Sequence, residues 1–399
     1  MTSQKAPSLF ILLLLVSFAS VSAVLFTPGL PQIAHQLGIS DAASQLTITV
    51  FLIGYTFGLL PYGPLSDRFG RKPTVYLGIL IAILGCFLVL LVEKFHSFPL
   101  LLIGRLLTAL GSCVGLKIAF TMVGDTYQHG KATKMISYMM LSFAIAPALA
   151  IGVGGFLTTH FGWSSCFYFQ TVYSIFLLIM TIYLPETCKE KDFNALAVKT
   201  IARNYLEKIK NKKLITCALM MGCGASIIYL FAAVAPFIGI EKIGLSPDHY
   251  GLLNLIPPIG LIVGSLLANY LSEKKEQLPV MLLGSIIAIA FTALMLVLFL
   301  LGIVNVWTLF LPMPFIYIGE SLVYANASSL ILTHAKNKSY ASATMGFLTM
   351  GSCAITLLLA GWIPSHSAVI MPFIFTVIVV FMLLLLGALW RIFNPALLK

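Results

Sequence analysis

Long apolar runs, separated by short polar connections, follow one another along the whole chain. Each run holds ~20 residues, the length that an α-helix needs to cross the hydrocarbon core of a bilayer. The runs are continuous and do not alternate at period two, so we expect helices and not the strands of a barrel. The pattern predicts about twelve membrane-spanning helices, near residues 8–28, 43–63, 73–92, 98–122, 134–157, 163–184, 214–238, 249–271, 278–301, 306–332, 340–362 and 368–391.

The longest polar interval divides the chain nearly in half and leaves six predicted helices on each side. Two six-helix halves joined by an inner loop are typical of transporters that are built from repeats. The predicted organisation is a six-helix bundle, a cytoplasmic linker and a second six-helix bundle, at residues 1–186, 187–213 and 214–399.

The linker itself is open to two interpretations. Val198, Ala202, Tyr205 and Ile209 recur at helical spacing with basic residues between them. This spacing fits a short amphipathic helix that lies on the membrane surface. A merely solvated basic linker fits the same residues almost as well.

Composition and charge support a membrane protein and indicate its orientation. Only 9% of the 399 residues are charged and 59% are hydrophobic, whereas soluble domains carry about 25% charged residues. The net charge of +11 is concentrated in the even-numbered connections and at the termini, and only Lys94 and Lys242 lie in odd-numbered ones. Basic loops face the cytoplasm, so we expect a protein of the inner (cytoplasmic) membrane with both termini on the cytoplasmic side. The positive charge does not imply a nucleic-acid partner.

No enzyme or cofactor site is predicted from the sequence. The seven cysteines are scattered and no pair has the spacing of a metal site. No nucleophile–base set or nucleotide-binding loop is present, so catalysis and ATP-driven transport are not expected. We therefore predict no cofactor and no metal.

The connection after the second predicted helix carries a specific motif, "GPLSDRFGRKP". It resembles the loop signature of the major facilitator superfamily, a fold of twelve transmembrane helices in two pseudo-symmetric bundles. The matching positions are Gly63, Leu65, Asp67, Arg68, Gly70, Arg71 and Lys72. Glycine permits close helix approach and a tight turn, and an acid can pair with arginine or cap a helix N-terminus. We expect a cytoplasmic gate here; a simple basic topology signal would not need Asp67.

Further stretches resemble the drug:proton antiporter branch, in particular Bcr/CflA-like exporters. They include "GRLLTALGSCVG" in the fourth predicted helix and "APALAIGVGGFLTTHFGW" across the fifth. The resemblance implies multidrug-type efflux with proton coupling through Arg105 and a monomeric transporter. It also implies an antiporter motif in the fifth helix, with the positions Pro147, Gly152, Gly154 and Gly155.

Three positions depart from the pattern of that branch. Val24 stands where many relatives have a first-helix acid, Thr108 replaces a glutamine near Arg105, and Ile151 replaces a proline. These departures concern the coupling of drug export and leave the predicted fold unchanged.

Ionisable residues at membrane depth are few, and Glu320 is the only acid among them. Arg105 and Lys117 are the bases within predicted helices. Charge at the centre of a transmembrane helix costs on the order of 2.5–3.5 kcal/mol, so such residues mark functional sites. Lys117 and Glu320 lie ~27 and ~21 Å along their helices, and we predict a Lys117–Glu320 pair across the interface between the halves. The pair should form when the cavity is closed on that side and be replaced by a proton or substrate otherwise. The alternatives are snorkelling of Lys117 towards the headgroups and a static ionic role for Glu320.

The helix around Glu320 also carries candidate substrate contacts. Tyr317, Glu320 and Tyr324 share one face by their spacing, with Ser328 below them. Plain helix packing explains tyrosines at this spacing equally well. The residues predicted to line the substrate cavity are Tyr317, Tyr324, Thr108 and Asn326.

The sequence therefore predicts a proton-coupled transporter that exports small amphipathic compounds by alternating access. Its expected partners are a small-molecule substrate, protons and the lipid bilayer. The main alternative is transport of an anionic metabolite or carboxylate siderophore, because two bases face one acid. A receptor or scaffold with no flux is a third possibility.

Overall fold

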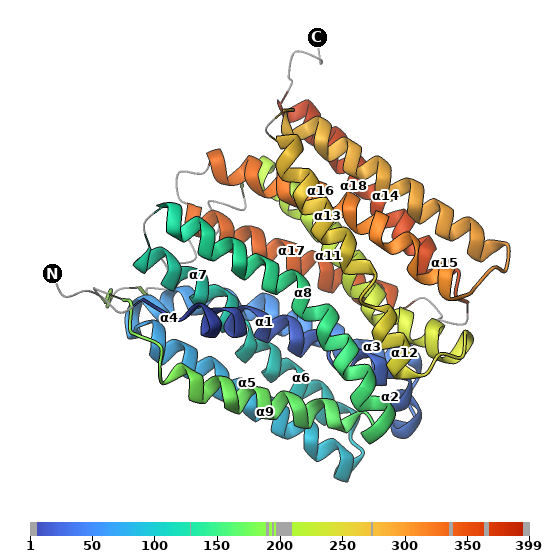
Figure 1. The fold of residues 1–399 in the computed structure, drawn as a ribbon, viewed down its shortest axis with the longest axis horizontal. Helices are drawn as coiled ribbons and strands as arrows, with labels where there is room; N and C mark the ends of the chain where they lie inside the picture. The colour runs from blue at the N-terminus through green and yellow to red at the C-terminus, as the bar shows by residue number, and fades with distance from the viewer. Residues whose placement is uncertain are drawn as a thin grey trace.

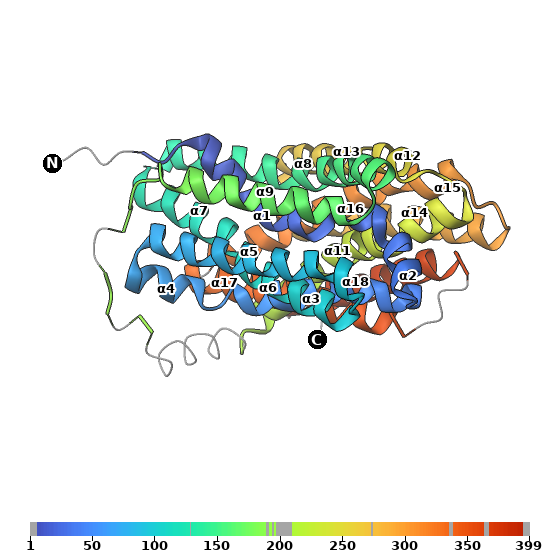
Figure 2. The same ribbon diagram turned by 90° about the horizontal axis from the view of Figure 1, so that it is seen from below.

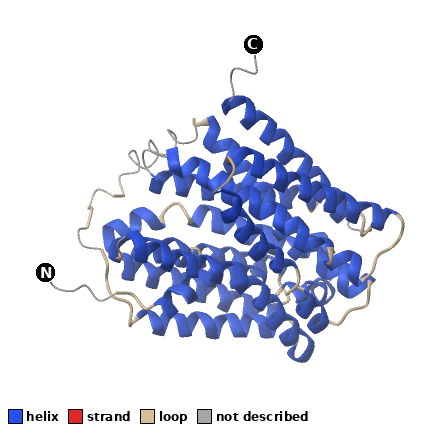
Figure 3. Ribbon diagram, turned by 45° about the horizontal axis from the view of Figure 1, so that its top comes forward, coloured by secondary structure: helices blue, strands red, loops and turns tan. Residues whose placement is uncertain are grey.

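The computed structural model consists of helices and short connections and describes most of the chain. The residues that it describes are 6–127, 129–188, 191–193, 195–196, 210–272, 274–334, 338–362 and 367–393. No strand occurs among these residues (Figure 3), and the predicted all-helical membrane fold is confirmed. The proposed amphipathic helix over residues 198–209 lies outside the described ranges.

Ten elements precede the linker. They are α1 (Leu9–Val24), the 3₁₀ turn η1 (Thr27–Gly29), α2 (Leu30–Leu37), α3 (Asp41–Gly58), α4 (Tyr62–Phe69), α5 (Arg71–Phe95), α6 (Phe98–Ser112), α7 (Val114–Thr126), α8 (His129–Phe161) and α9 (Ser164–Thr181).

Nine elements follow the linker. They are α11 (Lys212–Pro236), the π-helix η2 (Phe237–Lys242), α12 (Pro247–Leu253), α13 (Pro257–Ser272), α14 (Gln277–Leu300), α15 (Val306–Phe310), α16 (Pro312–His334), α17 (Lys338–Ala360) and α18 (Ile370–Phe393).

The described helices are long and apolar enough to form eleven or twelve membrane spans. Eleven candidate spans are formed by one helix or by nearly continuous helices. The twelfth candidate is the pair α3 and α4, which is bent by 44°. The bend lies at Pro61, which cannot donate a backbone hydrogen bond. The first span is longer than predicted because the chain continues through Pro28 and Pro31 into α2 and ends at Leu37.

The elements form two helix bundles that contact each other at one end of the molecule and along α3 and α17. Helices α1 to α9 pack against one another, and so do α11 to α18. The bundles approach closely where α8 crosses α12 and where α2 and η1 meet α11 and η2. In Figure 1 they converge towards this end, called the far end below, and diverge towards the end that carries the chain termini. Figure 2 shows α4 and α15 at opposite ends of the molecule, with the N-terminus on the side of α4.

Two further contacts join the bundles. Helix α3 packs along α17, where a Cβ added to Gly351 would lie 3.5 Å from Thr56 Cγ2. At the far end, the N–H of Asp248 donates to Thr159 Oγ1 over 3.0 Å. These contacts fix how α12 and α17 sit against the first bundle.

Within the first bundle, α5 and α6 touch through their backbones. Gly78 on α5 faces Gly111 on α6, and Gly85 faces Gly104. The two glycines on each helix are seven residues apart, which is two helical turns. A Cβ added to Gly104 would lie 2.8 Å from the carbonyl oxygen of Gly85, closer than side chains pack. Small residues at such positions allow the close helix packing that stabilises membrane proteins.

This contact predicts that Gly111→Ala destabilises the protein. A Cβ at Gly111 would collide with the backbone of Gly78 and Ala82, and overpacking typically costs about 1–3 kcal/mol. We expect a lower thermal unfolding temperature in detergent. Gly387→Ala on α18 is the matched control, because a Cβ there meets no atom within 4 Å. Equal melting of the two variants would show that the α5–α6 contact is not tight.

Candidate functional site

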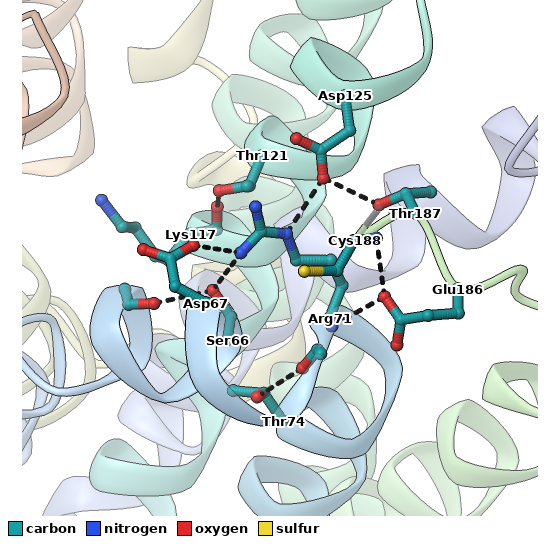
Figure 4. Close-up of polar contacts among 12 residues, drawn as sticks. Ser66, Asp67, Arg71, Thr74, Lys117, Thr121, Asp125, Glu186, Thr187 and Cys188 are labelled. Atoms are coloured by element: carbon teal, nitrogen blue, oxygen red, sulfur yellow. Dashed lines mark hydrogen bonds and ion pairs between the residues drawn. The ribbon is translucent and has the colours of Figure 1, made fainter. Parts of the chain in front are cut away.

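A cluster of polar side chains surrounds the turn between α4 and α5 at the termini end (Figure 4). It is called the gate cluster below, after the gate that the sequence predicts here. Gly70 makes this turn with φ of 107°, a conformation that favours glycine. Arg71 follows directly, and its guanidinium forms an ion pair with Asp67 across the turn. Its Nη1 also donates to Ser66 Oγ over 2.9 Å, and its Nε donates to Asp125 Oδ2 at the end of α7 over 2.9 Å.

The N-terminus of α5 is capped by a carboxylate from beyond α9. Glu186 accepts hydrogen bonds from the backbone N–H of Arg71 over 2.9 Å, of Lys72 over 3.1 Å and of Cys188 over 2.9 Å. The positive end of the α5 dipole and these free N–H groups stabilise the acid there. A side chain at Gly70 would collide with this carboxylate, which is a second reason for glycine.

Other contacts tie the same segment to the first bundle. Thr187 Oγ1 donates to Asp125 Oδ2 over 2.9 Å, and Lys72 Nζ donates to the carbonyl of Ile182 over 2.7 Å. The cluster therefore fastens the start of the linker to α5 and α7. Asp125 and Glu186 were not among the predicted site residues, although Glu186 lies in the "PET" that directly follows the sixth predicted helix.

Two predicted gate residues lie at the edge of this cluster. The Arg68 guanidinium is 5.5 Å from the centre of the Phe69 ring. Gly63 faces the side chain of Lys117, whose Cε would lie 3.6 Å from a Cβ at Gly63. This is ordinary contact, so Gly63 does not provide the close helix approach that we expected of it. All hydrogen bonds of the cluster described above join residues between positions 66 and 188, so they lie within the first bundle and the start of the linker.

Arg105 is fully buried between α1 and α3, far from any carboxylate contact that the structure describes. Its exposed fraction is 0%, and Nη1 and Nη2 donate to the carbonyls of Ser22 over 2.7 Å and Ala23 over 3.2 Å. These carbonyls belong to the last turn of α1, the negative end of the helix dipole. The guanidinium also lies 4.3 and 4.5 Å from the ring centres of Phe26 and Phe51, a cation–π arrangement on each face.

The predicted antiporter-motif glycines lie where α8 meets the first helix and the second bundle. A Cβ at Gly154 would collide with the carbonyl of Leu25, and one at Gly155 would collide with that of Pro247 in α12. Gly152 also faces α12, with Gly251 O 3.7 Å from the position of a Cβ. Pro147 lies inside α8. The small residues thus permit the close crossing of α8 and α12.

Glu320 lies on α16 with its carboxyl group buried against α11. The residue is 3% exposed, and neither carboxyl oxygen has a hydrogen-bond partner among the described residues. The carboxyl occupies the place that a side chain at Gly224 of α11 would fill. An ionised carboxylate without a partner at this depth is strongly unfavourable.

The predicted Lys117–Glu320 pair is not formed in this structure. Lys117 lies on α7, which packs against α1, α4, α5 and α8, whereas α16 packs against α11, α13 and α14. In Figure 4 the Lys117 side chain lies beside Asp67 in the gate cluster. The pair was predicted for the state in which the cavity is closed on that side, and for that state it stays a prediction.

Three tyrosines from the two bundles lie near one another beside the Glu320 helix. The Tyr55 phenol of α3 is within electrostatic range of Tyr229 on α11 and Tyr324 on α16. Tyr324 is 40% exposed although it lies among residues of both bundles, so part of its ring lines space that the described residues do not fill. Tyr317, one turn above Glu320, is buried.

The other two predicted cavity residues are buried within single bundles. Thr108 is 1% exposed and donates to the carbonyl of Gly104, and a Cβ at Gly85 of α5 would lie 2.6 Å from its Oγ1. Asn326 is 2% exposed and its Nδ2 donates to the carbonyl of Leu322 over 2.9 Å. In this conformation neither faces the space that Tyr324 lines.

Comparison with known proteins agrees with the observed architecture. The family model of the Major Facilitator Superfamily matches residues 11–353. An uncharacterised transporter of Rickettsia felis is 29% identical over 80% of each chain. Multidrug resistance protein D of Escherichia coli is 25% identical over 80% of this chain and 79% of its own, and a bicyclomycin resistance protein homolog of Haemophilus influenzae is 26% identical over 67% of each.

Solved structures share the fold at low sequence identity. A D-xylose–proton symporter superposes with a TM-score of 0.75 at 14% identity, over 94% of this chain and 96% of its own. A mutant form of the nucleoside transporter NupG gives 0.74 at 14% identity, over 97% of this chain and 100% of its own.

The gate cluster predicts that Arg71→Gln destabilises the protein. The change removes the cation between Asp67 and Asp125 and leaves two carboxylates facing each other. Because Asp67 is largely exposed, we expect a loss of about 1–3 kcal/mol and not the full penalty of a buried pair. Thermal unfolding in detergent measures it. Arg68→Gln on the same turn is the control. If both variants melt at the wild-type temperature, the prediction is wrong.

Proposed function

Because this chain belongs to the major facilitator superfamily, we propose that it is a proton-coupled secondary transporter that exports small amphipathic compounds. It is a multi-pass membrane transporter and not an enzyme. The proposed units of alternating access are the bundles of residues 1–186 and 214–399, joined by the linker at residues 187–213. The protein would work as a monomer in the inner membrane.

The observation that carries this proposal is the unpaired, buried carboxyl of Glu320. In the described conformation it is 3% exposed and has no hydrogen-bond partner among the described residues, and we propose that it holds a proton there. A conformation that hydrates it would allow the proton to leave. Protonation is therefore linked to the arrangement of the bundles, which is the requirement for proton-coupled alternating access.

The positive-inside rule orients this cycle. Basic residues concentrate at the termini end, which we infer to be cytoplasmic. The bundles converge at the far end (Figure 1), and α3 and α17 also stay in contact towards the termini end, where Gly346 faces Leu59. We propose that this conformation is closed towards the outside and that the cytoplasm reaches it between the parts of the bundles that diverge. An exporter would take up its substrate in this conformation.

The placement of the two bases favours an amphipathic substrate over an anionic one. Arg105 is enclosed by carbonyls and aromatic rings at 0% exposure, and Lys117 lies in the gate cluster beside Asp67. Neither supplies the positive cavity on which the anionic alternative depends. Tyr324 instead offers an exposed aromatic ring close to the acid. The multidrug-resistance names of several relatives point to the same class of substrate.

The first functional prediction is that Glu320→Gln loses proton-driven transport. Glutamine keeps the volume but cannot release a proton, so we expect accumulation driven by a pH gradient in proteoliposomes to fall on the order of tenfold or more. Exchange of substrate down its own gradient should persist. Glu276→Gln, an exposed acid before α14, is the control. Undiminished proton-driven accumulation in Glu320→Gln would exclude the coupling role.

The second functional prediction concerns substrate charge. Cationic and neutral amphipathic dyes should compete for transport, whereas citrate-like anions should not. The measurement is inhibition of flux in proteoliposomes across a panel of both kinds. Competition by anions that is weakened in Lys117→Gln would support the anionic alternative, and the absence of any flux would support a scaffold.

A further inference from the structure

Gly224 lies in the middle of α11 and faces the Glu320 carboxyl group. A Cβ built on this glycine would collide with Oε2 and lie 3.3 Å from the carboxyl carbon and 3.7 Å from Cβ of Glu320. The carboxyl therefore fills a slot in the surface of α11 that exists only because residue 224 has no side chain. The slot depends on this one position.

The slot provides no polar compensation for the acid. Both carboxyl oxygens are buried and lack a hydrogen-bond partner in the described part of the chain. The thiol of Cys223 on α11 and the phenol of Tyr317 on α16 lie within electrostatic range of it, and both groups are ordinarily neutral at physiological pH. No cation is described beside it. The slot thus favours the protonated acid through dehydration alone.

A second glycine on the same helix serves a different contact. Gly222 faces α17, where a Cβ would collide with Ser352 Oγ and lie 3.1 Å from the carbonyl oxygen of Thr349. Its role is the packing of α11 against α17. Adding a methyl group at Gly222 would therefore disturb α11 about as much as one at Gly224, without touching Glu320.

We propose that Gly224 is the positioning residue of the proton site: its missing side chain holds the Glu320 carboxyl in a dry slot on α11 and so sets the pH at which the acid ionises. A methyl group at this position would push the carboxyl out of the slot, towards the space that Tyr324 lines. Water would then reach the carboxylate and stabilise its charged form. The significance for transport rests on the proposed function, whereas the slot itself does not.

The test measures the protonation of Glu320 directly. A hydrophobic carbodiimide reacts with protonated buried carboxyl groups, and mass spectrometry of the full-length protein in nanodiscs quantifies labelling at Glu320 as pH is raised. We expect the pH midpoint of labelling in Gly224→Ala to fall by about one unit or more relative to the wild type. Gly222→Ala should keep the wild-type midpoint, and Glu320→Gln identifies the labelled peptide.

The outcomes separate this inference from the proposed function. An unchanged midpoint in folded Gly224→Ala, or the same shift in Gly222→Ala, would overturn the slot. If Glu320→Gln transports normally while the Gly224→Ala shift is present, the coupling role fails and the slot stands.

A second variant covers poor folding of Gly224→Ala. Aspartate is one methylene shorter than glutamate, so Glu320→Asp retracts the carboxyl group from α11. We expect the double variant Gly224→Ala/Glu320→Asp to recover most of the melting temperature that Gly224→Ala loses. No recovery would show that the glycine does not act through the acid.

Discussion

An ion in a hydrocarbon environment must be solvated by the protein, moved to the membrane surface or neutralised, and this chain uses all three solutions. Arg105 is solvated by the last carbonyls of α1 and by two aromatic rings. Lys117 lies beside an exposed acid in the gate cluster. Glu320 has no such compensation and is neutral. Because a neutral acid changes state by exchanging a proton, Glu320 can report the conformation of the bundles in the proposed cycle.

Much of the fold was predictable because membrane burial imposes a simple length rule. The apolar runs located the helices, and the motif around Gly70 located a turn whose φ of 107° the structure confirms. Segment ends were less predictable, since Pro28 and Pro31 continue the first span into α2. Hydropathy measures apolar length, and it does not register how a helix bends or restarts.

The site was predictable in its residues and not in its contacts. Counting charges found Glu320, but spacing along two separate helices gave no information on which way the side chains point, so the Lys117–Glu320 pair was proposed and is absent here. Glu186 and Gly224 were missed for a related reason. Each acts across a long sequence interval, Glu186 as the cap of α5 and Gly224 as the slot for Glu320, and no local pattern records such a contact.

The departure at Val24 has a structural explanation that bears on coupling. Where many relatives have a first-helix acid, Arg105 here meets the carbonyls of Ser22 and Ala23 at the end of α1. A backbone carbonyl cannot release or accept a proton at physiological pH, so this neighbourhood holds a cation without titrating. In the proposed cycle the proton is exchanged in the second bundle, where the slot at Gly224 accommodates Glu320. A permanent charge in one bundle and a titratable one in the other need no direct contact, because only the second changes state when water reaches it.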